Sequence, residues 1–77
     1  MTKLDWSPYR ERGARTRVHD QASFYEGVEL ELIAEGGQWA VRRTTWQNFK
    51  IVRQEETARG TARKARETWH WLTGRSV

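Results

Sequence analysis

Apolar and polar positions alternate most clearly over residues 28–34, the period of a half-buried β-strand. The next two residues, Gly36 and Gly37, tolerate the positive φ angles that a two-residue hairpin turn requires. We therefore predict a second, antiparallel strand over residues 38–44. Folding about the two glycines gives three facing pairs: Ala34 with Trp39, Leu32 with Val41, and Glu31 with Arg42. Apolar pairs meet on one face and a pair of opposite charges on the other, which supports the hairpin.

Two further elements follow from the same kind of pattern. A short run at 49–52 predicts a third strand, after a turn over 45–48, since two strands alone are marginally stable. Spacings of three and four then predict a helix whose apolar stripe is Ala58, Ala62, Ala65, Trp69 and Leu72. Acidic residues 55 and 56 suit the start of this helix, and Gly74 suits its C-cap.

The first 22 residues show neither period, because Ser7-Pro8 and Gly13 interrupt a stretch dominated by charge. We interpret residues 1–22 as a basic N-terminal arm and residues 23–77 as a single domain of the β-β-β-α type. The predicted fold class is α+β: a three-stranded antiparallel sheet covered by one C-terminal helix. Six residues share the two periodicities and form the expected core: Leu32, Trp39, Val41, Ala62, Ala65 and Trp69.

Composition limits how such a chain can be stabilised. Seventy-seven residues without cysteine exclude disulfides and thiolate metal sites, and the two histidines lie far apart. Five tryptophans supply large apolar area, and self-association into a homo-oligomer is another source of stability. The chain contains neither an apolar run of membrane-spanning length nor a signal-like segment at its start. We therefore expect a cytoplasmic protein without a membrane partner.

Catalysis is not expected from this inventory of residues. No serine lies in a nucleophile-elbow pattern, and the Gly36-Gly37 pair lacks the lysine and hydroxyl residue of a phosphate loop. A fold of this length also has little room for a pocket of about 300 Å³. We predict a protein that is not an enzyme, has no cofactor and no metal, and acts by binding.

Charge is distributed unevenly along the chain. The net charge is +4, and residues 1–22 and 53–77 are basic whereas the middle is slightly acidic. Basic segments favour nucleic acid as the partner. The candidate phosphate contacts lie in the arm and on the helix: Arg10, Arg12, Arg15, Arg17, Arg59, Arg63, Lys64 and Arg66. An alternative is a solvated helix face, in which Glu55–Arg59 and Arg63–Glu67 pair at i,i+4.

A protein partner is the alternative function. Trp46 and Trp71 fall off the predicted core faces, and tryptophan is enriched at interface hot spots. The acidic middle of the chain favours the same interpretation, with a host protein as the partner. Either indole could instead stack on a base of a nucleic acid.

Two short patterns resemble known proteins. The segment Lys3-Leu4-Asp5-Trp6-Ser7 resembles the start of small uncharacterised proteins of actinobacterial phages, which implies an accessory protein of a phage or mobile element. Residues 28–72 resemble uncharacterised three-strand-plus-helix domains with a Gly-x-Trp-x-Val strand and an alanine-rich helix; here these are Gly37, Trp39, Val41, Ala58, Ala62 and Ala65.

The same outline is similar to the arm-binding domain of phage tyrosine integrases, which inserts its sheet into the major groove. The outer sheet face of this chain presents Glu29, Glu31 and Arg42 instead of a basic set. We therefore expect phosphate contacts from the arm and the helix and not from the sheet.

Overall fold

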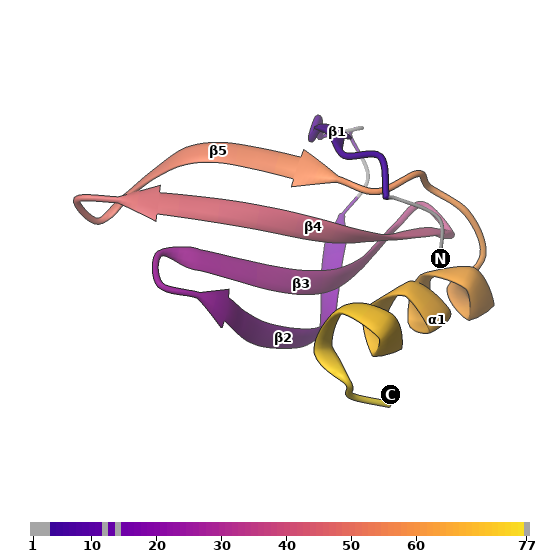
Figure 1. Ribbon diagram of the computed structural model, residues 1–77. Coiled ribbons are helices and arrows are strands. Elements are labelled where there is room, and N and C mark those ends of the chain that lie inside the picture. The colour runs from indigo at the N-terminus through magenta and orange to yellow at the C-terminus, as the bar shows by residue number, and fades with distance from the viewer. Residues whose placement is uncertain (1–3, 12, 14, 77) are drawn as a thin grey trace.

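The protein is described by a computed structural model that covers residues 4–11, 13 and 15–76. Within these residues the chain forms one antiparallel sheet of five strands and one C-terminal helix, an α+β arrangement (Figure 1). The elements are β1 (Ser7–Pro8), β2 (Thr16–Tyr25), β3 (Val28–Glu35), β4 (Gln38–Gln47), β5 (Lys50–Glu56) and α1 (Ala62–Thr73). The strand order is β1-β5-β4-β3-β2, so the three-stranded sheet predicted from the sequence is wrong.

The predicted hairpin is the part of the sheet that the sequence specified best. Strands β3 and β4 pair with the three facing pairs expected from the turn: Ala34 with Trp39, Leu32 with Val41, and Glu31 with Arg42. Gly36 and Gly37 both have positive φ, 56° and 82°, which suits a two-residue hairpin turn.

The predicted N-terminal arm is instead part of the sheet. β1 pairs with β5 at one edge, and β2 pairs with β3 at the other edge. The register of β2 shifts between Val18 and Asp20, so His19 is an extra residue that breaks the alternation of faces. Most of β2 is exposed as an edge strand, which explains why its sequence lacks an apolar period.

The last strand and the helix both begin later than predicted. The turn before β5 lies at Asn48 and Phe49, and β5 continues through the two acidic residues that were assigned to the helix start. Helix α1 begins after Thr61, whose hydroxyl accepts a hydrogen bond from the backbone N–H of Lys64. It ends at Gly74, a left-handed C-cap as predicted.

The core lies between α1 and the sheet. Helix α1 packs against β3 and β4 and covers the face that carries Leu30, Leu32 and Val41. Trp69 and Ala65 from the helix complete this cluster, and the Trp69 side chain is fully buried. Four of the six predicted core residues are therefore buried, whereas Ala62 is half-buried and Trp39 is half-buried against the edge of the cluster.

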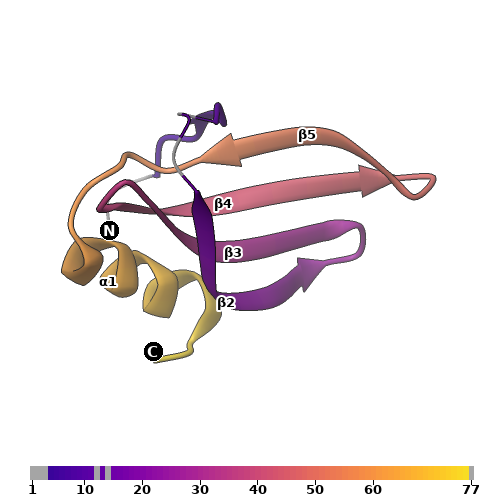
Figure 2. The same cartoon turned by 180° about the vertical axis from the view of Figure 1, so that it is seen from behind.

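The opposite face of the sheet is covered by the N-terminal chain. After β1 the chain passes Tyr9, whose hydroxyl reaches Glu35 of β3, and then enters β2 at Thr16. Figure 2 shows the first half of β2 crossing the view of β3 and β4 on its way from the β1 edge. Ile33 and Ala40 are buried as well, although they alternate with the residues that face the helix.

Candidate nucleic-acid interface

Ion pairing separates the cations of this protein into two groups. Five described arginines form ion pairs with carboxylates of the sheet: Arg42, Arg43, Arg53, Arg59 and Arg75. Six described cations form none: Arg15, Arg17, Lys50, Arg63, Lys64 and Arg66. Five members of the second group belong to the contacts predicted from the sequence, so the structure leaves their charges available to a ligand.

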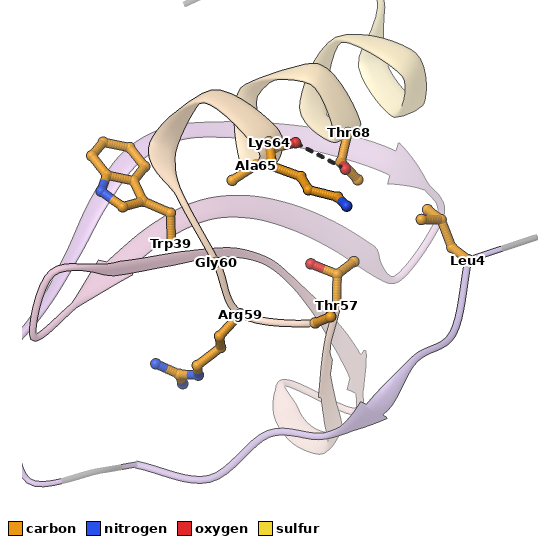
Figure 3. Close-up of a pocket in the computed structure, with 9 residues that line it drawn as sticks. Leu4, Trp39, Thr57, Arg59, Gly60, Lys64, Ala65 and Thr68 are labelled. Carbon is orange, nitrogen blue, oxygen red and sulfur yellow. Dashed lines mark hydrogen bonds between the residues drawn. The ribbon is translucent and has the colours of Figure 1, made fainter. Parts of the chain in front are cut away.

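Arg59 belongs to the first group, although the sequence placed it on the helix stripe. It precedes α1, and its Nε lies 2.6 Å from Glu56 while its Nη2 pairs with Glu35. Only 8% of its side chain is exposed. Figure 3 shows Arg59 pointing away from Lys64 and the helix. Burial lowers the pKa of Arg59, but hydrogen bonds to the two carboxylates outweigh this and raise it, so the side chain stays a cation.

Glu35 is the central acceptor of this buried polar cluster. Its Oε2 accepts hydrogen bonds from the hydroxyls of Tyr9, at 2.5 Å, and of Thr16. Burial raises the pKa of Glu35, but hydrogen bonds from Thr16, Tyr9 and Arg59 outweigh it and lower the pKa to about 2. The cluster therefore fixes the N-terminal chain to the sheet. Its cation, Arg59, is already paired with carboxylates and is not available to an external phosphate.

Trp39 is the residue around which the unpaired cations gather. Its ring stacks on His19 of β2 with centroids 4.2 Å apart, and the guanidinium carbon of Arg66 lies 4.9 Å from its centroid. Trp39 and His19 also line an open hollow of about 450 Å³ together with Arg15 and Arg17. One strand-end tryptophan thus brings cations of β2 and α1 to the same end of the sheet.

The remaining unpaired cations extend this surface along the helix. Arg63 and Arg66 line one hollow on α1 with Glu67, and Arg63 does not pair with that glutamate. Lys64 lies on the other side, where it lines a small cavity of about 190 Å³ with Trp39 (Figure 3). We name this surface the Trp39 patch and define it as Arg15, Arg17, His19, Trp39, Arg63, Lys64 and Arg66.

The structure therefore joins part of the predicted arm with part of the predicted helix. Arg10 is exposed but already contacts a neighbour, so it is not counted in the patch. Arg12 lies outside the described residues. The sequence did not single out His19, and it placed Trp39 in the core; the Gly-Gly turn beside Trp39 was the available signal that this tryptophan sits at a sheet end.

The two tryptophans predicted as partner contacts lie elsewhere. Trp46 is 40% exposed near the turn between β2 and β3, and Trp71 is 48% exposed on α1. Trp71 lines an apolar hollow with Trp6 and Phe24. Neither indole lines the hollows that contain Trp39, Arg63 and Arg66.

Comparison with protein-family models, curated proteins and solved structures gave no match. The resemblance to phage proteins therefore stays a prediction. No described helix is long and apolar enough to cross a membrane. Among the residues that the structure describes, no three His, Asp or Glu side chains come together as metal ligands.

Proposed function

We propose that the protein binds nucleic acid through the phosphate backbone at the Trp39 patch. The observation that carries this proposal is that five of the six described cations without an ion pair belong to one surface. A nucleic-acid partner also fits the predicted cytoplasmic location and the predicted role as an accessory protein of a phage or mobile element.

The unpaired state of these cations matters energetically. An arginine that already holds a carboxylate must lose that contact before it binds a phosphate, whereas an unpaired one exchanges only water and counterions. Arg17 extends from the edge strand β2 and Arg66 from α1, so backbone elements fix the starting points of both side chains, and Arg15 directly precedes β2. A surface of this kind attracts phosphates without selecting a base sequence.

Trp39 serves mainly to position the cations of the patch, Arg66 above all. Trp39 is half-buried, and it already contacts His19 and the Arg66 guanidinium, so it is not an open platform for a base. Stacking a planar guanidinium on an indole restricts its motion while its N–H groups remain able to donate. We therefore expect phosphate binding to dominate over base stacking at this site.

The sheet face that carries Glu29, Glu31 and Arg42 is not suited to bind phosphates, which supports binding at the Trp39 patch. Arg42 donates to both carboxylate oxygens of Glu31, with Nε at 3.0 Å and Nη2 at 2.8 Å. Glu29 lies on the same strand face without a cation partner among the described residues. This face therefore has no excess positive charge with which to contact a row of phosphates. We do not propose that the sheet inserts into a groove of the nucleic acid.

The test is a titration of labelled duplex and single-stranded oligonucleotides at about 50 and about 200 mM salt. Wild type is expected to bind at the lower salt, and each phosphate contact adds about 0.9 to the slope of log K against log salt on a duplex. The variant Arg15→Ala/Arg17→Ala should bind more weakly with a shallower slope.

The matched control is Arg53→Glu, which changes the net charge by the same amount in β5, away from both the Trp39 patch and the β4–β5 turn. Arg53 is exposed. The control should bind with the wild-type slope. If it loses as much affinity as the double variant, net charge and not the Trp39 patch is responsible. If wild type does not bind at the lower salt, the proposal is wrong.

A further inference from the structure

The end of the sheet remote from α1 carries an exposed aromatic knob. Figures 1 and 2 both place the β2–β3 turn and the β4–β5 turn at this end. Phe49 occupies the second turn, and its residue surface is 99% exposed. The neighbouring Lys50 is also exposed and has no ion pair among the described residues. Together Phe49 and Lys50 form what we call the knob.

The backbone at the knob is unfavourable for the residue it carries. Phe49 has φ of 62° and follows Asn48, which has φ of 53°. Two positive φ angles are typical of the hairpin turn in which glycine is preferred at the second position. A bulky residue in this region is uncommon and costs free energy, and such strain is concentrated at functional sites. The turn therefore holds a phenyl ring in solvent at the expense of stability.

A hollow with complementary properties lies beside the knob, on the β2–β3 side. It has a volume of about 380 Å³, and its walls include Phe24, Tyr25 and Trp46. The backbone N–H of Trp46 in β4 donates a hydrogen bond of 2.7 Å to the carbonyl of Gly27 in the β2–β3 turn, which fixes this wall of the hollow. Pockets of more than about 300 Å³ accommodate small ligands, so the hollow has room for one aromatic side chain.

The charges of the knob and the hollow are opposite. Glu26 and Glu29 line the hollow, and neither pairs with a cation among the described residues. Lys50 beside the phenyl ring is unpaired as well. The ring of Phe49 thus matches the aromatic walls of the hollow, and the charge of Lys50 matches its carboxylates. One chain carries both the knob and the hollow.

We propose that the occupant of the hollow is the knob of a second copy of this chain. Because both halves lie at one end of the sheet, a two-fold axis lets each copy insert Phe49 into the hollow of the other, and the contact closes as a dimer. Lys50 of one copy then faces Glu26 of its partner, and the reciprocal pair forms across the axis.

This dimer is independent of nucleic-acid binding. The Trp39 patch lies at the β3–β4 turn, the opposite end of the sheet, so pairing through the knobs leaves both patches exposed. A domain of this length buries a smaller fraction of its unfolded surface than a larger domain does, and oligomerisation is one way in which small folds are stabilised.

The first test is sedimentation equilibrium of wild type and Phe49→Gly over a wide range of concentration. Glycine adopts the observed φ without strain, so this variant removes the ring without endangering the turn. We expect wild type to dimerise and Phe49→Gly to raise the dissociation constant at least about thirtyfold, as loss of one anchor residue does. The control Asn48→Gly changes the same turn, keeps the ring and should dimerise like wild type.

The second test exchanges the charges. Lys50→Glu and Glu26→Lys should each dimerise more weakly than wild type, because like charges then meet across the axis. An equimolar mixture of the two variants should form heterodimers, in which both contacts are again between opposite charges. A mixture no tighter than either variant alone overturns the proposed pairing.

Other results contradict the proposal directly. Wild type that stays monomeric at the highest concentration excludes a second copy as the occupant, and so does undiminished dimerisation of Phe49→Gly. A monomeric wild type that sediments with anionic vesicles, while Phe49→Gly does not, assigns the knob to a lipid surface instead.

Discussion

The indole Nε1 of Trp69 donates a hydrogen bond of 3.0 Å to Oδ2 of Asp20, which joins the middle of α1 to the edge strand β2. The other oxygen of this carboxylate, Oδ1, accepts a hydrogen bond of 3.0 Å from Nη2 of Arg75, which follows the helix. Asp20 therefore holds the helix and the segment after it against a strand that has no apolar period of its own.

Trp69→Ala is expected to destabilise the fold by about 3–5 kcal/mol, because it removes a fully buried indole and leaves Asp20 without its helix partner. Trp71→Ala is the matched control two residues later. Its indole is 48% exposed, so the cost should be no more than about 2 kcal/mol. Urea unfolding monitored by circular dichroism measures both costs, and equal costs would mean that Trp69 is no more buried than Trp71.

Arg59→Ala should be a folding variant and not a binding variant. Its guanidinium is the buried partner of Glu35 and Glu56, and removing one partner of a buried ion pair costs about 3–5 kcal/mol. Arg53→Ala, with 64% of the side chain exposed, should change stability by less than about 0.5 kcal/mol. Thermal unfolding separates the two, and an Arg59→Ala protein as stable as wild type would show that this cluster does not hold the fold together.

Stability should fall in acid through Glu35. Its pKa is about 2 in the folded protein and 4.5 ordinarily, so the unfolded chain binds the proton first as pH falls. The contribution of Glu35 is fully present above pH 4.5 and is lost as pH falls to about 2. Urea midpoints measured across this window should decline steeply for wild type.

Glu35→Gln is the control for this pH dependence. It should be less stable at neutral pH, because Arg59 loses a charged partner, yet its stability should decline less between pH 4.5 and about 2. Parallel curves for the two proteins would assign the acid sensitivity to other carboxylates.

Phe49→Gly should make the isolated monomer more stable by about 1 kcal/mol, since glycine removes the cost of a left-handed residue. Asn48→Gly should give a smaller gain, because asparagine tolerates this region better than phenylalanine does. Unfolding at low protein concentration measures this effect separately from dimerisation. A loss of stability in Phe49→Gly would mean that the ring packs within its own chain.

The sequence predicted the hairpin in which both strands alternate apolar and polar residues. It missed the edge strand β2, which has no such alternation. The β3–β4 register followed from a short turn and from the facing of Leu32 with Val41. Strand β2 was not predicted because most of this edge strand is exposed to solvent, and because the extra residue His19 breaks its alternation of faces. The turn before β5 was misplaced because Phe49 is an unusual residue for it.

The candidate site was predicted in separate pieces. Arg15 and Arg17 were assigned to an arm and Arg63 and Arg66 to a helix, and their meeting at Trp39 depends on pairing between β2 and β3. Such long-range contacts leave no local period in the sequence. Arg59 was assigned to the same helix because the glutamates before it look like a helix start.

The bridge between Trp39 and Gly60 has a consequence for motion. Two reciprocal backbone hydrogen bonds, of 2.8 and 2.9 Å, join the first residues of β4 to the turn that precedes α1. The helix cannot swing away from the sheet without breaking both, so its amides and those of the β3–β4 hairpin should exchange with deuterium as one cooperative unit. The β4–β5 turn lacks such a tie and should open locally, on a faster timescale than the end of the sheet that carries Trp39.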